Sequence, residues 1–240
     1  MNVDFENLTI KLGEEKIERI GSDCKTKYFK FVGLFLDEYL TWEHQVQHVH
    51  NKLSSGNYAI NSAKNVLPLH IRKNIYNSLF RSHLEYGLLA WGGIPNNKLK
   101  GIIGLQKKCV RNVANKKYLS HTDPIFSSLK ILKFPDLVLY NSLIFMHKFA
   151  HGLQPQTFNN MFQPLGVNNR TGNYRLIKYN LKLFDQFPSI YLPKIWNEYS
   201  SSIKHCTTLT SVKAILTDKF ISRYKTEEFC EFERCPDCVT

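Results

Sequence analysis

Apolar residues recur every three or four positions over most of the chain, which is the pattern of amphipathic helices. Prolines that suit a first helical turn and glycines that suit a helix end divide this pattern into segments. We therefore predict a mainly α fold, a thumb-like helical bundle with a smaller helical C-terminal extension. The predicted helices cover residues 42–65, 68–91, 94–117, a segment starting at 123, and 135–152, 191–200 and 209–224.

Two parts of the chain alternate more like strands than helices. Residues 5–36 predict a β-hairpin around Gly13, followed by a strand from Tyr28 to Phe35 that is rich in aromatic and β-branched residues. Residues 174–184 predict one or two short strands, and the Pro-, Gly- and Asn-rich stretch 153–172 predicts a loop. The fold class is thus mainly α with an N-terminal hairpin or strand segment.

The two helices in the middle of the sequence have one apolar and one basic side. The apolar stripe of the first is predicted to be Ile71, Ile75, Leu79 and Leu84, and that of the second Leu99, Ile102, Ile103, Val110 and Val113. Lys73, Arg81 and Glu85 follow another side of the first helix at i, i+4 spacing. Thr41 and Asp123 are the predicted caps of the helices that begin near them.

Charge is concentrated in this middle part. Residues 51–120 hold twelve Lys and Arg against one acid, Glu85, so the segment carries a net charge of +11 out of +12 for the whole chain. A positive field on adjacent helices is typical of a protein that binds a polyanion, most often nucleic acid. The alternative without a ligand is that the lysines and arginines only keep exposed helix faces solvated. The candidate nucleic-acid-binding residues are Arg72, Lys73, Arg81, Lys100, Lys107, Lys108, Arg111, Lys116 and Lys117.

Four segments in order resemble a known family. FVGLFLDEYLTW (31–42), LPLHIRKNIYNSLFRSHLEYGLLAWGG (67–93), LQKKCVRNV (105–113) and HTDPIFSSLKILKFPDLVLYNSLIFMHKF (121–149) are similar to the region after the palm in reverse transcriptases of non-LTR, jockey-like retrotransposons. This resemblance implies a polymerase thumb followed by a helical extension.

The same resemblance implies what the chain lacks. Reverse transcriptases use two metal ions held by palm carboxylates, and no Asp-Asp pair occurs in this sequence. The chain is therefore expected to be a fragment without polymerase activity of its own. It should carry no cofactor, bind an RNA or RNA–DNA duplex through phosphates, and have a palm-containing polymerase portion as a possible partner. Three alternatives stay open: a truncated gene model of an active reverse transcriptase, a helical protein-interaction scaffold, and a decayed element.

These inferences divide the chain into six parts. They are residues 1–40 as palm-to-thumb strands, 41–119 as the basic thumb-like bundle, 120–153 as a helical extension, 154–173 as a linker, 174–226 as C-terminal strands and helices, and 227–240 as a flexible tail.

Histidine and cysteine offer weak metal signals. His44 and His48 have the i, i+4 spacing of a shared ligand pair but no fitting third partner. Cys230, Cys235 and Cys238 lie in the tail, where Cys-x-x-Cys could hold zinc, although a structural site needs four ligands. No metal site is therefore predicted. The absence of a signal-peptide pattern and of a long apolar run predicts an intracellular protein, in nucleus or cytoplasm, without a membrane contact.

Overall fold

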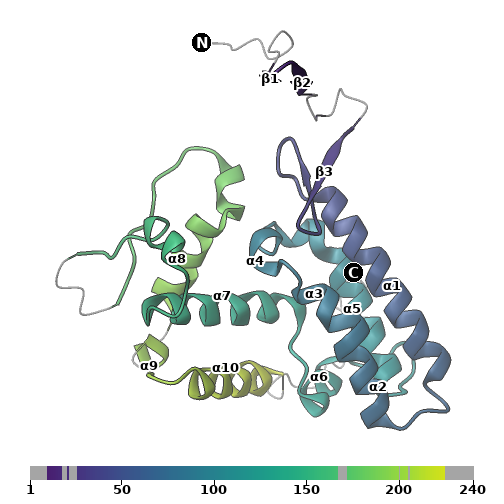
Figure 1. Ribbon diagram of the computed structural model, residues 1–240. Helices are drawn as coiled ribbons and strands as arrows, with labels where there is room; N and C mark the ends of the chain where they lie inside the picture. Colours follow the sequence, from purple (N-terminus) through teal and green to yellow (C-terminus); the bar gives the residue numbers. More distant parts are fainter. Residues whose placement is uncertain are drawn as a thin grey trace. The chain divides into compact units, whose positions relative to one another are not determined.

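The computed structural model describes residues 10–17, 21, 26–166, 172–199, 201–204 and 206–224, and Figure 1 shows the order of their elements. The chain forms two compact units, residues 1–47 and 48–240, which are described separately. The described part is mainly helical with an N-terminal antiparallel hairpin, which confirms the predicted fold class. The tail cysteines lie outside the described residues.

The first unit contains two small antiparallel hairpins. Strands β1 (Ile10–Leu12) and β2 (Glu15–Ile17) form the hairpin predicted around Gly13. The single strand predicted next is in fact a second hairpin, of β3 (Tyr28–Phe31) and β4 (Leu34–Asp37). Its two turn residues have φ values of 45° and 79°, the left-handed conformation that the tightest hairpin turns require. The prediction missed this turn because only its second residue is glycine.

Asp37 fixes the start of helix α1 (Glu43–Ala63) within the first unit. Its carboxylate accepts hydrogen bonds from the backbone N–H groups of Thr41, at 2.8 Å, and Trp42, at 3.0 Å. The predicted cap Thr41 gives the helix only one long contact, 3.4 Å from its hydroxyl to the Glu43 nitrogen. Asp37 holds the backbone that leads into the helix better because a carboxylate can accept several N–H groups at once.

The second unit continues with the rest of α1 and a set of helices around Trp91. These are α2 (Leu69–Ile75), the π-helix η2 (Tyr76–Arg81), α3 (Ser82–Glu85), α4 (Leu88–Trp91) and α5 (Asn96–Val113). Pro68 and Pro95 directly precede α2 and α5, as predicted. The helix predicted at residues 68–91 ends earlier than expected, because Gly87 adopts a left-handed φ of 60° and separates α3 from α4.

The π-helix changes which side of this helix is buried. The Ser82 N–H bonds to the carbonyl of Asn77, five residues earlier. Tyr76 and Phe80 are fully buried, whereas Leu79, predicted to face the core, is 44% exposed. The wider turn shifts the apolar stripe, so the aromatic rings of Tyr76 and Phe80 enter the core and Leu79 does not, whereas Leu84 is fully buried as predicted.

Helix α7 (Phe134–Ala150) is the central helix of the remaining chain, as predicted. It contacts α4, α5, α8 (Pro188–Glu198) and α10 (Leu209–Arg223), and Figure 1 shows α10 running alongside it. The other elements are α6 (Asp123–Leu129), the 3₁₀ turns η3 (Gln156–Asn160) and η4 (Lys182–Gln186), and α9 (Ser201–Lys204). None of the helices in the described ranges has the length and hydropathy needed to cross a bilayer.

Two local predictions in this half are wrong. Residues 174–184 contain a single β-bridge, between Tyr174 and Pro164, and a 3₁₀ turn in place of strands. The Asn197 amide accepts from the Tyr174 N–H at 2.9 Å and donates to its carbonyl at 2.7 Å, which occupies the groups that a strand would use. Asp123 is the first residue of α6 and not its cap; its carboxylate accepts from the Lys133 ammonium at 2.8 Å.

Candidate nucleic-acid interface

Helix α5 carries the centre of the basic segment, and a buried glutamine fixes its position. The Gln106 side-chain nitrogen donates to the Tyr76 hydroxyl at 3.1 Å and to the Leu132 carbonyl at 3.0 Å. Its oxygen accepts from the Phe134 N–H at 2.8 Å. Gln106 is 1% exposed and lies on the buried side of α5, where the sequence predicted only aliphatic residues. The hydrogen bonds of Gln106 thus join α5 to the π-helix η2 and to the chain at the start of α7.

Three predicted lysines of α5 lie on the side opposite this core. At 3.6 residues per turn, Lys100, Lys107 and Lys108 fall within an arc of about 100°. Lys100 and Lys108 are exposed and Lys107 is half-buried. Gly104 lies within the same arc, and a Cβ there would meet no atom within 4 Å. This side of α5 is therefore a shallow surface edged by ammonium groups.

Two predicted arginines belong to the interior. Arg72 is 8% exposed, and one of its guanidinium nitrogens donates to the Asn112 carbonyl at 3.4 Å. It occupies the buried stripe of α2, four residues before Tyr76, whereas the next residue, Lys73, is half-buried. Its cation lies by the C-terminal carbonyls of α5, where the helix dipole favours positive charge. Arg72 therefore caps a helix and is not placed to contact a phosphate.

Arg111 is 9% exposed although it lies in the same arc as Lys107. The chain after α5 folds back over it, and the Arg111 Nε–H donates to the Ser120 carbonyl at 2.7 Å. The Arg111 cation is therefore largely covered in the structure, which the sequence did not indicate, because helical periodicity cannot show which chain segment covers a helix end.

Arg81 is the remaining candidate residue of the segment predicted as a helix at residues 68–91. Its Nε and Nη2 atoms donate to one carboxylate oxygen of Glu85, at 3.0 and 2.9 Å. Both side chains are partly exposed, so the pair contributes little to stability. Glu85 compensates the charge of Arg81 and leaves the lysines as the main source of the positive field.

Lys116 and Lys117 are exposed on a turn that immediately follows α5. Asn115 has a left-handed φ of 51°, its N–H bonds to the Asn112 carbonyl at 3.1 Å, and the Lys116 N–H bonds to the Arg111 carbonyl at 2.9 Å. These two bonds form a Schellman motif, with asparagine in the position usually taken by glycine. The backbone of the turn is thereby fixed to the helix end.

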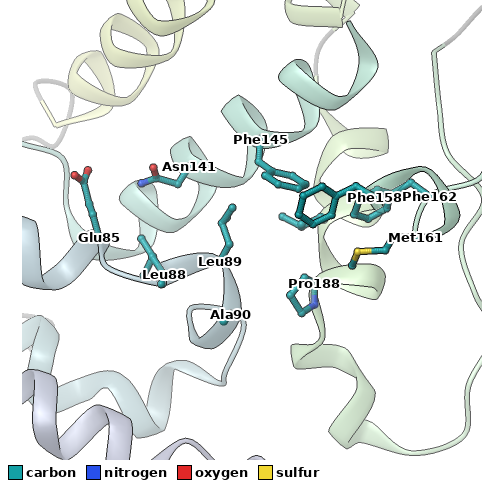
Figure 2. A pocket seen from close by; sticks show the side chains of 12 residues that line it. Glu85, Leu88, Leu89, Ala90, Asn141, Phe145, Phe158, Met161, Phe162 and Pro188 are labelled. Carbon is teal, nitrogen blue, oxygen red and sulfur yellow. The ribbon is translucent and has the colours of Figure 1, made fainter. Parts of the chain in front are cut away.

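The second unit also contains an apolar pocket, and none of these lysines lines it. It has a volume of about 450 Å³, and Figure 2 shows Glu85 and Asn141 toward one end and aromatic side chains toward the other. Its only polar side chains are the ion-paired carboxylate of Glu85 and the Asn141 amide, which donates to a backbone carbonyl. The lining residues are Glu85, Gly87, Leu88, Leu89, Ala90, Asn141, Phe145, Phe158, Met161, Phe162, Pro188 and Leu192. Such a lining offers apolar contact but no nucleophile.

Other chemically reactive groups serve structural roles. His147 is fully buried, its Nε2 lies 2.7 Å from the Cys206 carbonyl, and its ring stacks on His151 at 4.1 Å. Burial raises the pKa of the Cys109 thiol, which disfavours the nucleophilic thiolate. No group of three or more His, Cys, Asp or Glu able to hold a metal occurs within the described ranges.

Searches of protein-family models, curated proteins and solved structures returned no match to the chain. The function is therefore inferred from the residues of this chain alone.

Proposed function

We propose that the chain binds nucleic acid through the phosphate backbone, as the thumb-like part of a non-LTR, jockey-like reverse transcriptase that lacks the catalytic palm. The observation that carries the proposal is the charge distribution: twelve cations and one acid in residues 51–120. The order of the four family-like segments supports the assignment to this class of polymerase. On this proposal the protein is intracellular and meets its ligand in the nucleus or cytoplasm.

The surface we propose, called the lysine surface below, consists of Lys100, Lys107, Lys108, Lys116 and Lys117. Four of these side chains are exposed and one is half-buried, and all lie on α5 or on the turn fixed to its end. Because α5 is anchored by the buried Gln106, the ammonium groups of Lys100, Lys107 and Lys108 project from a rigid helix. Rigid presentation lowers the entropy lost on binding.

The shape of the ligand follows from the kind of contact. Lysine ammonium groups bind phosphates as point charges and read no base sequence. The major groove of an A-form duplex is too deep and narrow for side chains, so phosphate and shape contacts should dominate on RNA or an RNA–DNA hybrid. The absence of a side chain at Gly104 lets a phosphate backbone approach the helix between the lysines.

The test is binding of the purified chain to a fluorescently labelled RNA–DNA hybrid, titrated over a series of salt concentrations. Each lysine that contacts a phosphate should add about 0.9 to the slope of log affinity against log salt. The variant K100E/K107E/K108E should therefore lose about 2 to 3 of that slope and at least about tenfold in affinity.

The matched control is K178E/K182E/K194E, which changes the net charge equally on exposed lysines outside the basic segment. It should bind nearly as well as the parent protein. Equal losses in the two variants would show that only net charge matters, and equal binding of the parent to polyglutamate would favour an acidic protein partner over nucleic acid.

A further inference from the structure

The turn after α5 displays an aromatic ring directly after two lysines. The Ser120 N–H bonds to the Lys117 carbonyl at 3.1 Å, which closes a β-turn with Tyr118 and Leu119 in its two central positions. Side chains at a turn corner point away from the chain, and Tyr118 is 72% and Leu119 88% exposed. Lys116 and Lys117 come directly before them and are exposed as well.

The ring is held in place by the buried Arg111. The Arg111 guanidinium lies 5.9 Å from the centre of the Tyr118 ring, within range of a cation–π interaction. The same side chain donates to the Ser120 carbonyl at 2.7 Å, so it fixes both the backbone and the ring of the turn. Arg111 thus acts as a positioning residue for Tyr118, and its burial, which excludes it from phosphate contact, serves this arrangement.

An aromatic ring next to two lysines matches the chemistry of single-stranded nucleic acid. Proteins that bind single strands stack bases on aromatic side chains and hold the neighbouring phosphates with cations. Inside a duplex both faces of a base are covered by its neighbours, so an exposed ring can stack only on an unpaired base or at a duplex end. Lys108 precedes the last residue of α5 by five positions, about 7.5 Å along the axis, so one ligand can reach both parts.

We propose that the turn Lys116–Leu119 binds an unpaired nucleotide, with the Tyr118 ring stacked on the base and Lys116 and Lys117 on the flanking phosphates. The inference rests on the proposed function and extends it: the lysines of α5 hold the duplex, and the turn holds the adjoining single strand. The ligand of the whole lysine surface is then a duplex with a single-stranded extension, as a primer–template has.

The test compares a blunt RNA–DNA hybrid with the same hybrid bearing a four-nucleotide overhang that contains 2-aminopurine. The parent protein should bind the overhang hybrid about 5- to 150-fold more tightly, the range expected for stacking one base, and quench the 2-aminopurine fluorescence. Tyr118→Ala should lose this preference and the quenching, whereas blunt-hybrid affinity should change less than about twofold. Tyr118→Phe should keep both, because stacking needs the ring and not the hydroxyl.

The control variant is Tyr58→Ala, which removes a tyrosine of the same exposure, 73%, from α1. It should behave as the parent protein. Equal behaviour of Tyr118→Ala and Tyr58→Ala, with tight blunt-hybrid binding, overturns this inference and leaves the proposed function standing. No binding to either hybrid overturns both.

An aromatic and a leucine beside two lysines would also suit an anionic membrane surface. Sedimentation with vesicles of phosphatidylcholine and phosphatidylserine tests this directly. Vesicle binding that Tyr118→Ala abolishes, together with no preference for the overhang, would replace the single-strand proposal by a membrane contact.

Discussion

Replacing Gln106 by leucine should destabilise the protein severely, although leucine has a similar volume and is more apolar. Gln106 makes three hydrogen bonds in a site from which water is excluded, two of them to backbone groups near the start of α7. Leucine fills the space but cannot replace any of the three. The Phe134 N–H and the Leu132 carbonyl would then be buried without the partners they have now.

The magnitude follows from the number of groups left without a partner. An unsatisfied buried donor or acceptor costs about 1–3 kcal/mol, so two backbone groups and a phenol give a loss of about 3–9 kcal/mol. That loss would lower the ratio of folded to unfolded protein more than about a hundredfold. Tyr76→Phe removes only one of the three bonds and leaves Gln106 bonded to the Leu132 carbonyl, so it should cost about 1 kcal/mol.

The assay is urea unfolding followed by circular dichroism for the parent, both single variants and the double variant. In the double variant the Tyr76→Phe change should cost less than it does alone, since Gln106 is already absent. A Gln106→Leu variant within about 1 kcal/mol of the parent would refute the reasoning, because it would mean that the buried groups find other partners.

Three further outcomes follow from the structure. Gly104→Ala should raise the free energy of unfolding by about 0.5–1 kcal/mol, because the added Cβ meets no atom within 4 Å and alanine favours the helix. Gly56→Ala should lower the free energy of unfolding, because its Cβ would lie 2.9 Å from a backbone carbonyl oxygen. Urea unfolding that ranks the two variants the other way would contradict this. Burial raises the pKa of Tyr76 above its ordinary value of 10.0, so the folded state keeps a proton that the unfolded state releases. The free energy of unfolding should therefore fall above about pH 10, by up to about 1.4 kcal/mol per pH unit for each such group, and a flat profile from about pH 9 to 11 would contradict it. Iodoacetamide should alkylate Cys206 of the native protein well before the buried Cys109, as read by peptide mass spectrometry; equal rates would show that the helix opens readily.

Helix positions could be predicted from the sequence because their signals are local. Pro68 and Pro95 mark helix starts through the conformation of a single residue, and the structure has α2 and α5 begin directly after them. The apolar side of α5 was predicted for the same reason, since a long regular helix keeps its period.

The errors arose where a distant segment decides the outcome. Arg111 has the helical position of a surface cation, and only the returning chain around Ser120 buries it. Tyr174 has strand-like neighbours, but the side chain of Asn197 takes its backbone groups. Tyr118 was overlooked because its exposure and its contact with Arg111 depend on the turn between Lys117 and Ser120, which the sequence did not predict. Its one sequence signal was an aromatic residue directly after two lysines.

The π-helix of residues 76–81 also has a consequence for comparing this chain with others. A hydrogen bond that spans five residues accommodates one residue more than an α-helix would in the same length. A homologous chain with a plain α-helix here should therefore align with a one-residue gap inside the helix, where alignment methods penalise gaps most. Position-by-position comparison across Tyr76–Arg81 would then place Leu84 opposite a neighbour of its true counterpart.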